Sequence, residues 1–81
     1  MHYTYILHSA ELDRFYIGST SDLAGRLERH LMNHKGFTSK AKDWEIIYIE
    51  EFETKTLAMK RERQIKSWKS ANKIRELISK N

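Results

Sequence analysis

The stretch that decides the fold is YTYILHSAELDRFYIG, at residues 3–18. Residues 3–8 are rich in β-branched and aromatic side chains, which are typical of a strand. A polar, turn-like segment follows at 10–14, and residues 15–18 predict a second short strand. Together they predict a β-hairpin whose loop is longer than two residues. Because side chains alternate along a strand, Tyr3 and Tyr5 are expected on the same side.

A helix is expected directly after this hairpin. Residues 19–22, Ser-Thr-Ser-Asp, supply several N-cap candidates. From Leu23 onward, leucines recur at i, i+4 and i+8, which is typical of an amphipathic helix. Arg26 flanks this leucine stripe, and His30 shares its face one turn further on. On these residues alone, an Arg26 paired with Asp22 and a solvated His30 remain the alternative.

The second half of the chain predicts one more strand and two helices. Residues 44–52 contain large apolar side chains in succession at 46–49, which predicts a strand covered on both faces and central or well packed in its sheet. Thr54 or Thr56 can cap a helix that continues to about Trp68, and Ser70 can cap a third. The predicted order is ββαβαα, an α+β fold with a small, three-stranded, mostly antiparallel sheet flanked by helices.

Length and composition predict a single domain over residues 1–81. The chain has no cysteine, which excludes disulfides and thiolate metal sites. No apolar run approaches the ~20 residues of a membrane span, and the N-terminus has no signal-peptide core. We therefore expect a cytoplasmic protein that does not contact a membrane.

Charge is unevenly distributed along the chain. Residues 1–54 carry six Lys/Arg and nine Asp/Glu, whereas residues 55–81 carry nine Lys/Arg and two Asp/Glu, a local net charge of +7. A basic segment on a less basic body is typical of a protein that contacts a polyanion such as DNA. A solvated helix face is the simpler alternative.

The second helix carries charge beside its apolar face. Arg61 falls within that face, and Glu62 lies on its border, where a carboxylate is costly unless it is paired or binds a cation. Glu62 can pair with Lys66 at i+4. It can also be the single carboxylate ligand of Mg²⁺, an ion that keeps several waters and takes few protein ligands.

Taken together, these residues resemble the GIY-YIG nuclease superfamily. Residues 3–5, Tyr-Thr-Tyr, match its first motif in a degenerate form, and residues 16–18, Tyr-Ile-Gly, match its second in full. The family arginine, histidine and acidic residue match Arg26, His30 and Glu62. The chain also looks like the small, single-domain bacterial branch, which is related to the N-terminal nuclease domain of excinuclease C.

The resemblance implies a DNA endonuclease that cuts phosphodiesters with one divalent ion, Mg²⁺ or Mn²⁺. Glu62 would hold the metal and Arg26 would stabilise the transition-state charge. Tyr5 is the first choice to orient or deprotonate the attacking water and Tyr16 the second, and a phenol with an ordinary pKa near ~10 needs nearby cations to act as a base. His30 would bond to the phosphate or to a tyrosine oxygen.

The resemblance also predicts DNA contacts. The excinuclease domain has a lysine after its second motif; here Ser19 and Thr20 follow, so that role is empty or filled by Lys40 or Lys42. The predicted nucleic-acid contacts are Lys40, Lys42, Arg61, Arg63, Lys66, Lys69 and Lys73. Phosphate contacts carry little sequence information, so specificity in DNA repair or recombination would come from an accessory protein.

Two other functions remain open at this stage. The first is a nucleic-acid-binding module of the same fold with little or no cleavage. The second is a Zn²⁺ site at His30 and His34, whose i,i+4 spacing suits a metal but whose third ligand would have to be His2, His8 or a carboxylate.

Overall fold

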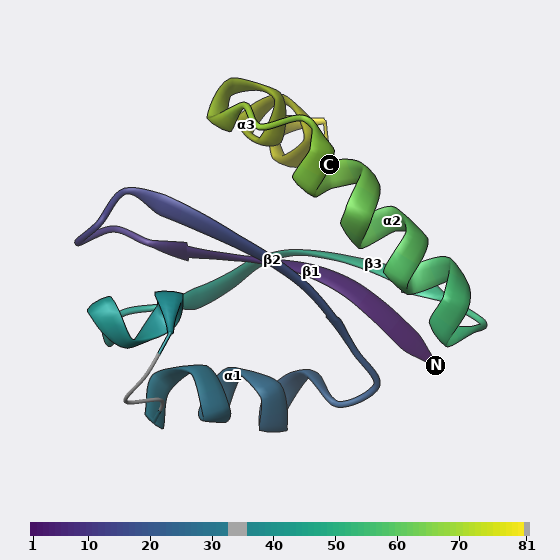
Figure 1. The fold of residues 1–81 in the computed structure, drawn as a ribbon, viewed down its shortest axis with the longest axis horizontal. Helices are drawn as coiled ribbons and strands as arrows, with labels where there is room; N and C mark the ends of the chain where they lie inside the picture. The colour runs from purple at the N-terminus through teal and green to yellow at the C-terminus, as the bar shows by residue number, and fades with distance from the viewer. Residues whose placement is uncertain (33–35, 81) are drawn as a thin grey trace.

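The computed structural model describes residues 1–32 and 36–80 (Figure 1). Its elements are β1 (His2–Ser9), β2 (Arg14–Thr20), α1 (Leu23–Met32), the 3-10 helix η1 (Phe37–Lys40), β3 (Glu45–Phe52), α2 (Lys55–Ser67) and α3 (Ala71–Ser79). The predicted order ββαβαα and the α+β class are confirmed. In the part of the chain that is described, no helix is long and apolar enough to cross a membrane.

The three strands form one antiparallel sheet in the order β2-β1-β3, so β1 is the central strand. A central place for the third strand is wrong, because β3 lies at an edge and its Ile49 is 44% exposed. Its cover on both faces is found, since Ile46 packs against the core of one face and Ile47 against that of the other. Of the strands in the described residues, β1 alone has strands on both sides, and its residues 4–7 are all buried. An apolar run therefore predicted a strand correctly but not its place in the sheet.

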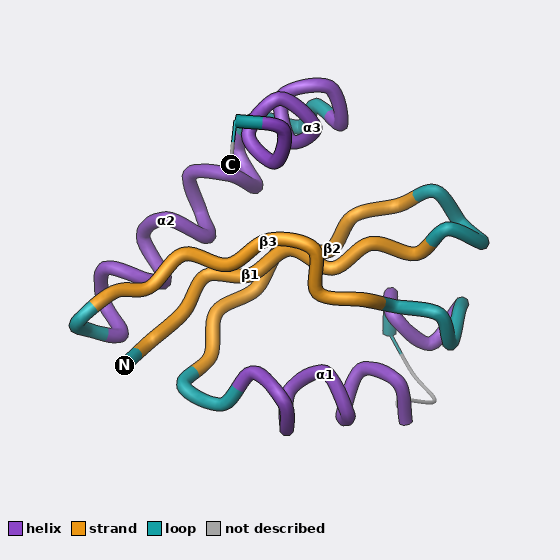
Figure 2. The backbone as a smooth tube through the Cα atoms, turned by 180° about the vertical axis from the view of Figure 1, so that it is seen from behind, coloured by secondary structure: helices purple, strands orange, loops and turns teal. Residues whose placement is uncertain are grey.

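Helices cover both faces of the sheet. Figure 1 shows α1 and η1 on one side and α2 and α3 on the other, and the rear view in Figure 2 shows the same arrangement. We call these sides the α1 face and the α2 face. The α1 face holds the core residues Tyr5, Leu7, Ala41 and Trp44, and the α2 face holds Ile6, Ile17, Ile65 and Ile74.

Each main helix begins at a side chain that accepts a backbone N–H. Asp22 Oδ1 accepts from Gly25 N at 3.1 Å, Thr54 Oγ1 accepts from Leu57 N at 3.2 Å, and Ser70 Oγ accepts from Lys73 N at 3.3 Å. Such caps are each worth about 1 kcal/mol. The helix starts predicted from the sequence are therefore found.

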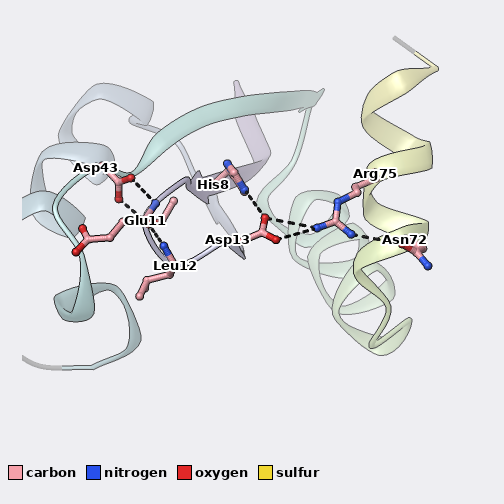
Figure 3. A network of polar contacts seen from close by, with 8 residues as sticks. His8, Glu11, Leu12, Asp13, Asp43, Asn72 and Arg75 are labelled. Carbon is pink, nitrogen blue, oxygen red and sulfur yellow. Dashed lines mark hydrogen bonds and ion pairs between the residues drawn. The ribbon is translucent and has the colours of Figure 1, made fainter.

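Polar contacts hold the loop of the β1–β2 hairpin on two sides (Figure 3). Asp13 lies 3.2 Å from His8 Nε2 and 3.5 Å from the Arg75 guanidinium on α3. Asp43 accepts from Ser9 Oγ at 2.6 Å and from Glu11 N at 2.8 Å. These hydrogen bonds, with Arg75 nearby for Asp13, lower the pKa of both carboxyl groups. The hairpin, and with it the register of β1 against β2, is held in place.

Candidate active site

Three rings predicted as site residues gather on the α1 face. Tyr5 Oη lies 3.0 Å from His30 Nε2. The Tyr16 ring meets the His30 ring edge-on, with 4.6 Å between centroids, and lies 6.5 Å from the Tyr5 ring. The pairing of Leu7 with Tyr16 across the strands puts Tyr16 on the same face as Tyr5. Strands β1 and β2 and helix α1 thus each supply one ring.

Gly18 makes room for the Tyr5 phenol. The two residues are paired across β1 and β2. A Cβ atom built on Gly18 would lie 2.5 Å from Tyr5 Oη and 2.6 Å from the ring carbon that bears it. The glycine of the Tyr-Ile-Gly motif is therefore needed for space.

His30 is held through both ring nitrogens. Its Nδ1 lies 3.1 Å from Thr38 Oγ1, opposite the contact of Nε2 with Tyr5. Thr38, in η1, is 3% exposed, and its carbonyl accepts from Trp44 Nε1 at 2.9 Å. Sequence reasoning missed Thr38, because one threonine in a polar segment carries no signal of its own.

Burial and neighbouring charges set the ionisation of Tyr5 and His30. Burial, with further contributions from Tyr16 and Glu62, raises the pKa of Tyr5 well above its usual range, although Arg26 lowers it in part. The depressed pKa that a phenolic base needs is thus not found for Tyr5 in the protein alone. Burial and Arg26 lower the pKa of His30. With Tyr5 protonated and His30 neutral, both ring nitrogens are satisfied if Tyr5 donates to Nε2 and Nδ1–H donates to Thr38 Oγ1.

Arg26 lies beside these rings, since its charge acts on the pKa of both Tyr5 and His30. Among the described residues, no ion pair joins it to Asp22, whose carboxylate caps the helix at Gly25. Arg26 Nε is buried and has no hydrogen-bond partner in the described structure. A buried donor normally has an acceptor, and the described residues do not provide one for this atom.

Glu62 and Lys66 reach the cluster from α2. The ion pair with Lys66, one of the two alternatives for Glu62, is formed, with Lys66 Nζ 2.6 Å from Glu62 Oε2. Lys66 Nζ also lies 5.9 Å from the centroid of the Tyr16 ring, and the Glu62 charge acts on the pKa of Tyr5. Although α2 covers the opposite face, β2 is an edge strand that α2 packs against. The pair therefore lies beside the phenols, at the outer edge of β2.

The remaining basic residues are spread over the surface. Arg61 is engaged structurally, with its Nε 2.9 Å from Glu50 Oε1 and its Nη1 2.9 Å from Gln64 Oε1. Lys66 and Lys69 line a groove of about 680 Å³ between the hairpin and the α2–α3 junction. Arg63 is exposed on α2, Lys73 on α3, Lys40 at the end of η1 and Lys42 just beyond it.

The donor set suits a hard divalent cation better than zinc. Within residues 1–32 and 36–80, no group of three His, Cys, Asp or Glu side chains could hold a metal ion. His34 lies outside the described residues, and both ring nitrogens of His30 are taken. A single carboxylate such as Glu62 fits Mg²⁺ or Mn²⁺, since Mg²⁺ is bound through one or two carboxylates and retains water.

Comparisons with known proteins match most of the chain. A family model described as the GIY-YIG catalytic domain matches residues 1–75. A UPF0213 protein of Natronomonas pharaonis is 33% identical over 75 residues, which cover 91% of this chain and 87% of the relative. A UPF0213 protein of Staphylococcus aureus (strain Mu50) is 31% identical over 75 residues, covering 91% and 90%. No solved structure matches the chain significantly.

Proposed function

The chain belongs to the GIY-YIG catalytic domain family, a nuclease-type fold, and from this premise we propose that it is a metal-dependent DNA endonuclease that hydrolyses phosphodiester bonds. One observation supports this most strongly: elements from both layers of the fold converge on the outer edge of β2. Strands β1 and β2 bring two phenols, α1 brings an arginine and an imidazole, and α2 brings a carboxylate.

Arg26 is the group that meets the phosphate. Its planar guanidinium can donate to two phosphate oxygens at once and stabilises the extra negative charge of the transition state. The buried Nε without a partner is the donor that a phosphate oxygen would satisfy. Its position beside Tyr5 and His30 would direct the scissile phosphate toward the rings.

The two tyrosines take different roles in this proposal. Tyr5 is 2% exposed and stays protonated at neutral pH, so it positions His30 and completes the wall of the site. Tyr16 is only half-buried and has the Lys66 ammonium near its ring, so it is the phenol that orients the attacking water. This proposal differs from the ranking expected from the sequence, which had Tyr5 first, and the difference rests on the burial of Tyr5.

Glu62 is the residue that would hold Mg²⁺ or Mn²⁺. When bound, that ion supplies Lewis-acid neutralisation of charge on the phosphate oxygens. In the protein alone, Lys66 neutralises the same carboxylate. The Lys66 ammonium therefore lies at the proposed metal ligand, where it can also contact a phosphate of the DNA.

A cleavage assay tests the proposal. Supercoiled, branched and single-stranded DNA are incubated with the protein and either Mg²⁺ or Mn²⁺. Glu62→Ala and Arg26→Ala should abolish cleavage, whereas Arg29→Ala, an exposed arginine one turn away on α1, should cut like wild type. Cleavage that survives in both site variants would overturn the assignment.

A second candidate is a DNA-binding module that does not cut. It is favoured by the 2.6 Å ion pair that occupies Glu62 and by the raised pKa of Tyr5. Its signature in the same assay is DNA binding without cleavage under either cation. In both cases phosphate contacts carry little sequence information, and an accessory protein would supply specificity in repair or recombination.

A further inference from the structure

A second polar cavity lies next to the candidate active site. It has a volume of about 250 Å³ and lies between the β2–α1 turn and the start of α2. Its polar lining consists of His2, Ser19, Thr20, Ser21, Arg26 and Lys55. Among the described residues, two cations and three hydroxyl groups thus line it, and no carboxylate does.

The cavity and the active site share residues. Arg26 lines the cavity and also acts on the pKa of Tyr5 and His30. Ala58, which lines it too, is one helical turn before Glu62 on α2. In both Figure 1 and Figure 2 the start of α2, the β2–α1 turn and the N-terminus lie at the same end of the molecule. The cavity therefore adjoins the site at the C-terminal end of β2.

Most of the hydrogen-bond donors that line this cavity have no partner among the described residues. Across the described residues, the side chains of Ser19, Ser21 and Lys55 form no hydrogen bond or ion pair, and Arg26 Nε is buried without a partner. Thr20 is the exception, because its hydroxyl accepts from Asp22 N at 3.0 Å. The neighbouring Asp22 carboxylate accepts from Gly25 N at 3.1 Å.

A cavity rich in donors, whose described lining has two cations and no carboxylate, favours an anion with several acceptor oxygens. We propose that it is a second phosphate subsite, which holds the phosphodiester next to the scissile one on the same DNA strand. Lys55 and Ser21 bind that phosphate, and Arg26 lies between the two phosphates. This inference rests on the proposed function, since it names the part of the DNA that this site would take.

Binding interference tests the subsite without requiring cleavage. In a Glu62→Gln background, Kd is measured by fluorescence anisotropy for single-stranded oligonucleotides that each carry one neutral methylphosphonate at a successive position. Lys55→Ala should weaken binding of the all-phosphate strand about tenfold and reduce the slope of log Kd against log salt by about 0.7, the value for one phosphate contact on a single strand.

The position of interference identifies the contact. With Lys55 present, a methylphosphonate at one position of the strand should weaken binding. In Lys55→Ala, a methylphosphonate at that position should no longer change Kd, and the effects at the other positions should be unchanged. Lys60→Ala is the matched control, because Lys60 is exposed on α2 and does not line the cavity. It should leave the sensitive position intact.

Two results would overturn the proposal. The first is equal behaviour of Lys55→Ala and Lys60→Ala at every methylphosphonate position. The second is a Lys55 effect seen only with a 5′-phosphorylated strand, which would place a strand end in the cavity instead of an internal phosphodiester. Because the readout is binding, a chain that never cuts DNA can still pass this test, and a chain that cuts can fail it.

Discussion

Tyr5 and Ile6 are neighbours on the central strand and are 2% and 0% exposed. They lie on opposite faces of the sheet, and the two faces have different roles. On the α1 face, Tyr5 begins a buried polar line through His30 to Thr38. On the α2 face, Ile6 packs in a core of isoleucines that aliphatic and aromatic side chains flank. Burial alone therefore does not separate the functional side of this strand from the structural side, whereas the partners of the buried polar atoms do.

The two faces differ in what they contribute to stability. Aliphatic burial on the α2 face is favourable without further conditions. Each polar group buried on the α1 face needs its partner, because an unsatisfied buried donor or acceptor costs about 1–3 kcal/mol. The α2 face should thus carry most of the stability, and the α1 face should be the more sensitive to small polar changes.

The largest expected effect is on the α2 face. Ile65 is fully buried there, so Ile65→Ala should lower the free energy of unfolding by about 2–5 kcal/mol through lost burial and a residual cavity. Urea unfolding followed by circular dichroism measures it. Leu57→Ala, on the same helix at 48% exposure, is the control and should change it by less than about 0.5 kcal/mol. Equal losses in the two variants would contradict the assigned core.

The next effect is steric, on the α1 face. Gly18→Ala puts a methyl group 2.5 Å from Tyr5 Oη, so the phenol must shift. Overpacking of this kind costs about 1–3 kcal/mol, and the displaced ring should also reduce DNA cleavage. Ser19→Ala, at the next position, should preserve the unfolding free energy. If Gly18→Ala is as stable and active as wild type, Tyr5 does not lie over Gly18.

A smaller effect is expected from an isosteric change in the polar line. Thr38→Val removes the Oγ1 partner of His30 Nδ1 and should cost about 1–2 kcal/mol of unfolding free energy. Thr38→Ser keeps the hydroxyl and should retain most of it. The pair separates the hydrogen bond from packing, and a Thr38→Ser variant as unstable as Thr38→Val would show that only packing matters.

The smallest effect is a pH dependence. The pKa of His30 is lowered in the folded protein, whereas in the unfolded chain it is near its ordinary value of 6.5. As pH falls through that value, the unfolded chain takes up the proton first, so stability present at neutral pH is lost. The difference in unfolding free energy between wild type and His30→Gln should therefore shrink between pH 7.5 and 5.5. A constant or growing difference would contradict the neutral, buried imidazole.

Much of the fold follows from local sequence pattern. The element order was predicted, and the caps at Asp22, Thr54 and Ser70 are among the candidates expected from the sequence, because caps and periodicity depend on neighbouring residues. The place of β3 at the edge was not, since an apolar run does not say how many strands lie beside it. Only the assembled sheet decides that β1 is central.

The candidate site shows the same division. The phenols, Arg26, His30 and Glu62 were singled out from spacing and resemblance. Thr38 and Lys55 were not singled out as site residues, because their roles depend on which elements meet in space. The Glu62–Lys66 pair was foreseen from its i,i+4 spacing, but its place beside Tyr16 depends on α2 packing against an edge strand. The raised pKa of Tyr5 likewise requires its burial, which spacing does not give.

The most direct test of the central claim, that the edge of β2 is a nuclease site, is the single-turnover rate of DNA cleavage by Glu62→Gln with Mg²⁺ or Mn²⁺. Glu76→Gln, an exposed glutamate on α3, is the matched control, and urea unfolding checks that both variants fold. We predict wild-type cleavage by Glu76→Gln and a loss of at least about 100-fold in Glu62→Gln, comparable to removing one transition-state-stabilising group. Cleavage by a folded Glu62→Gln protein at the wild-type rate would contradict the account.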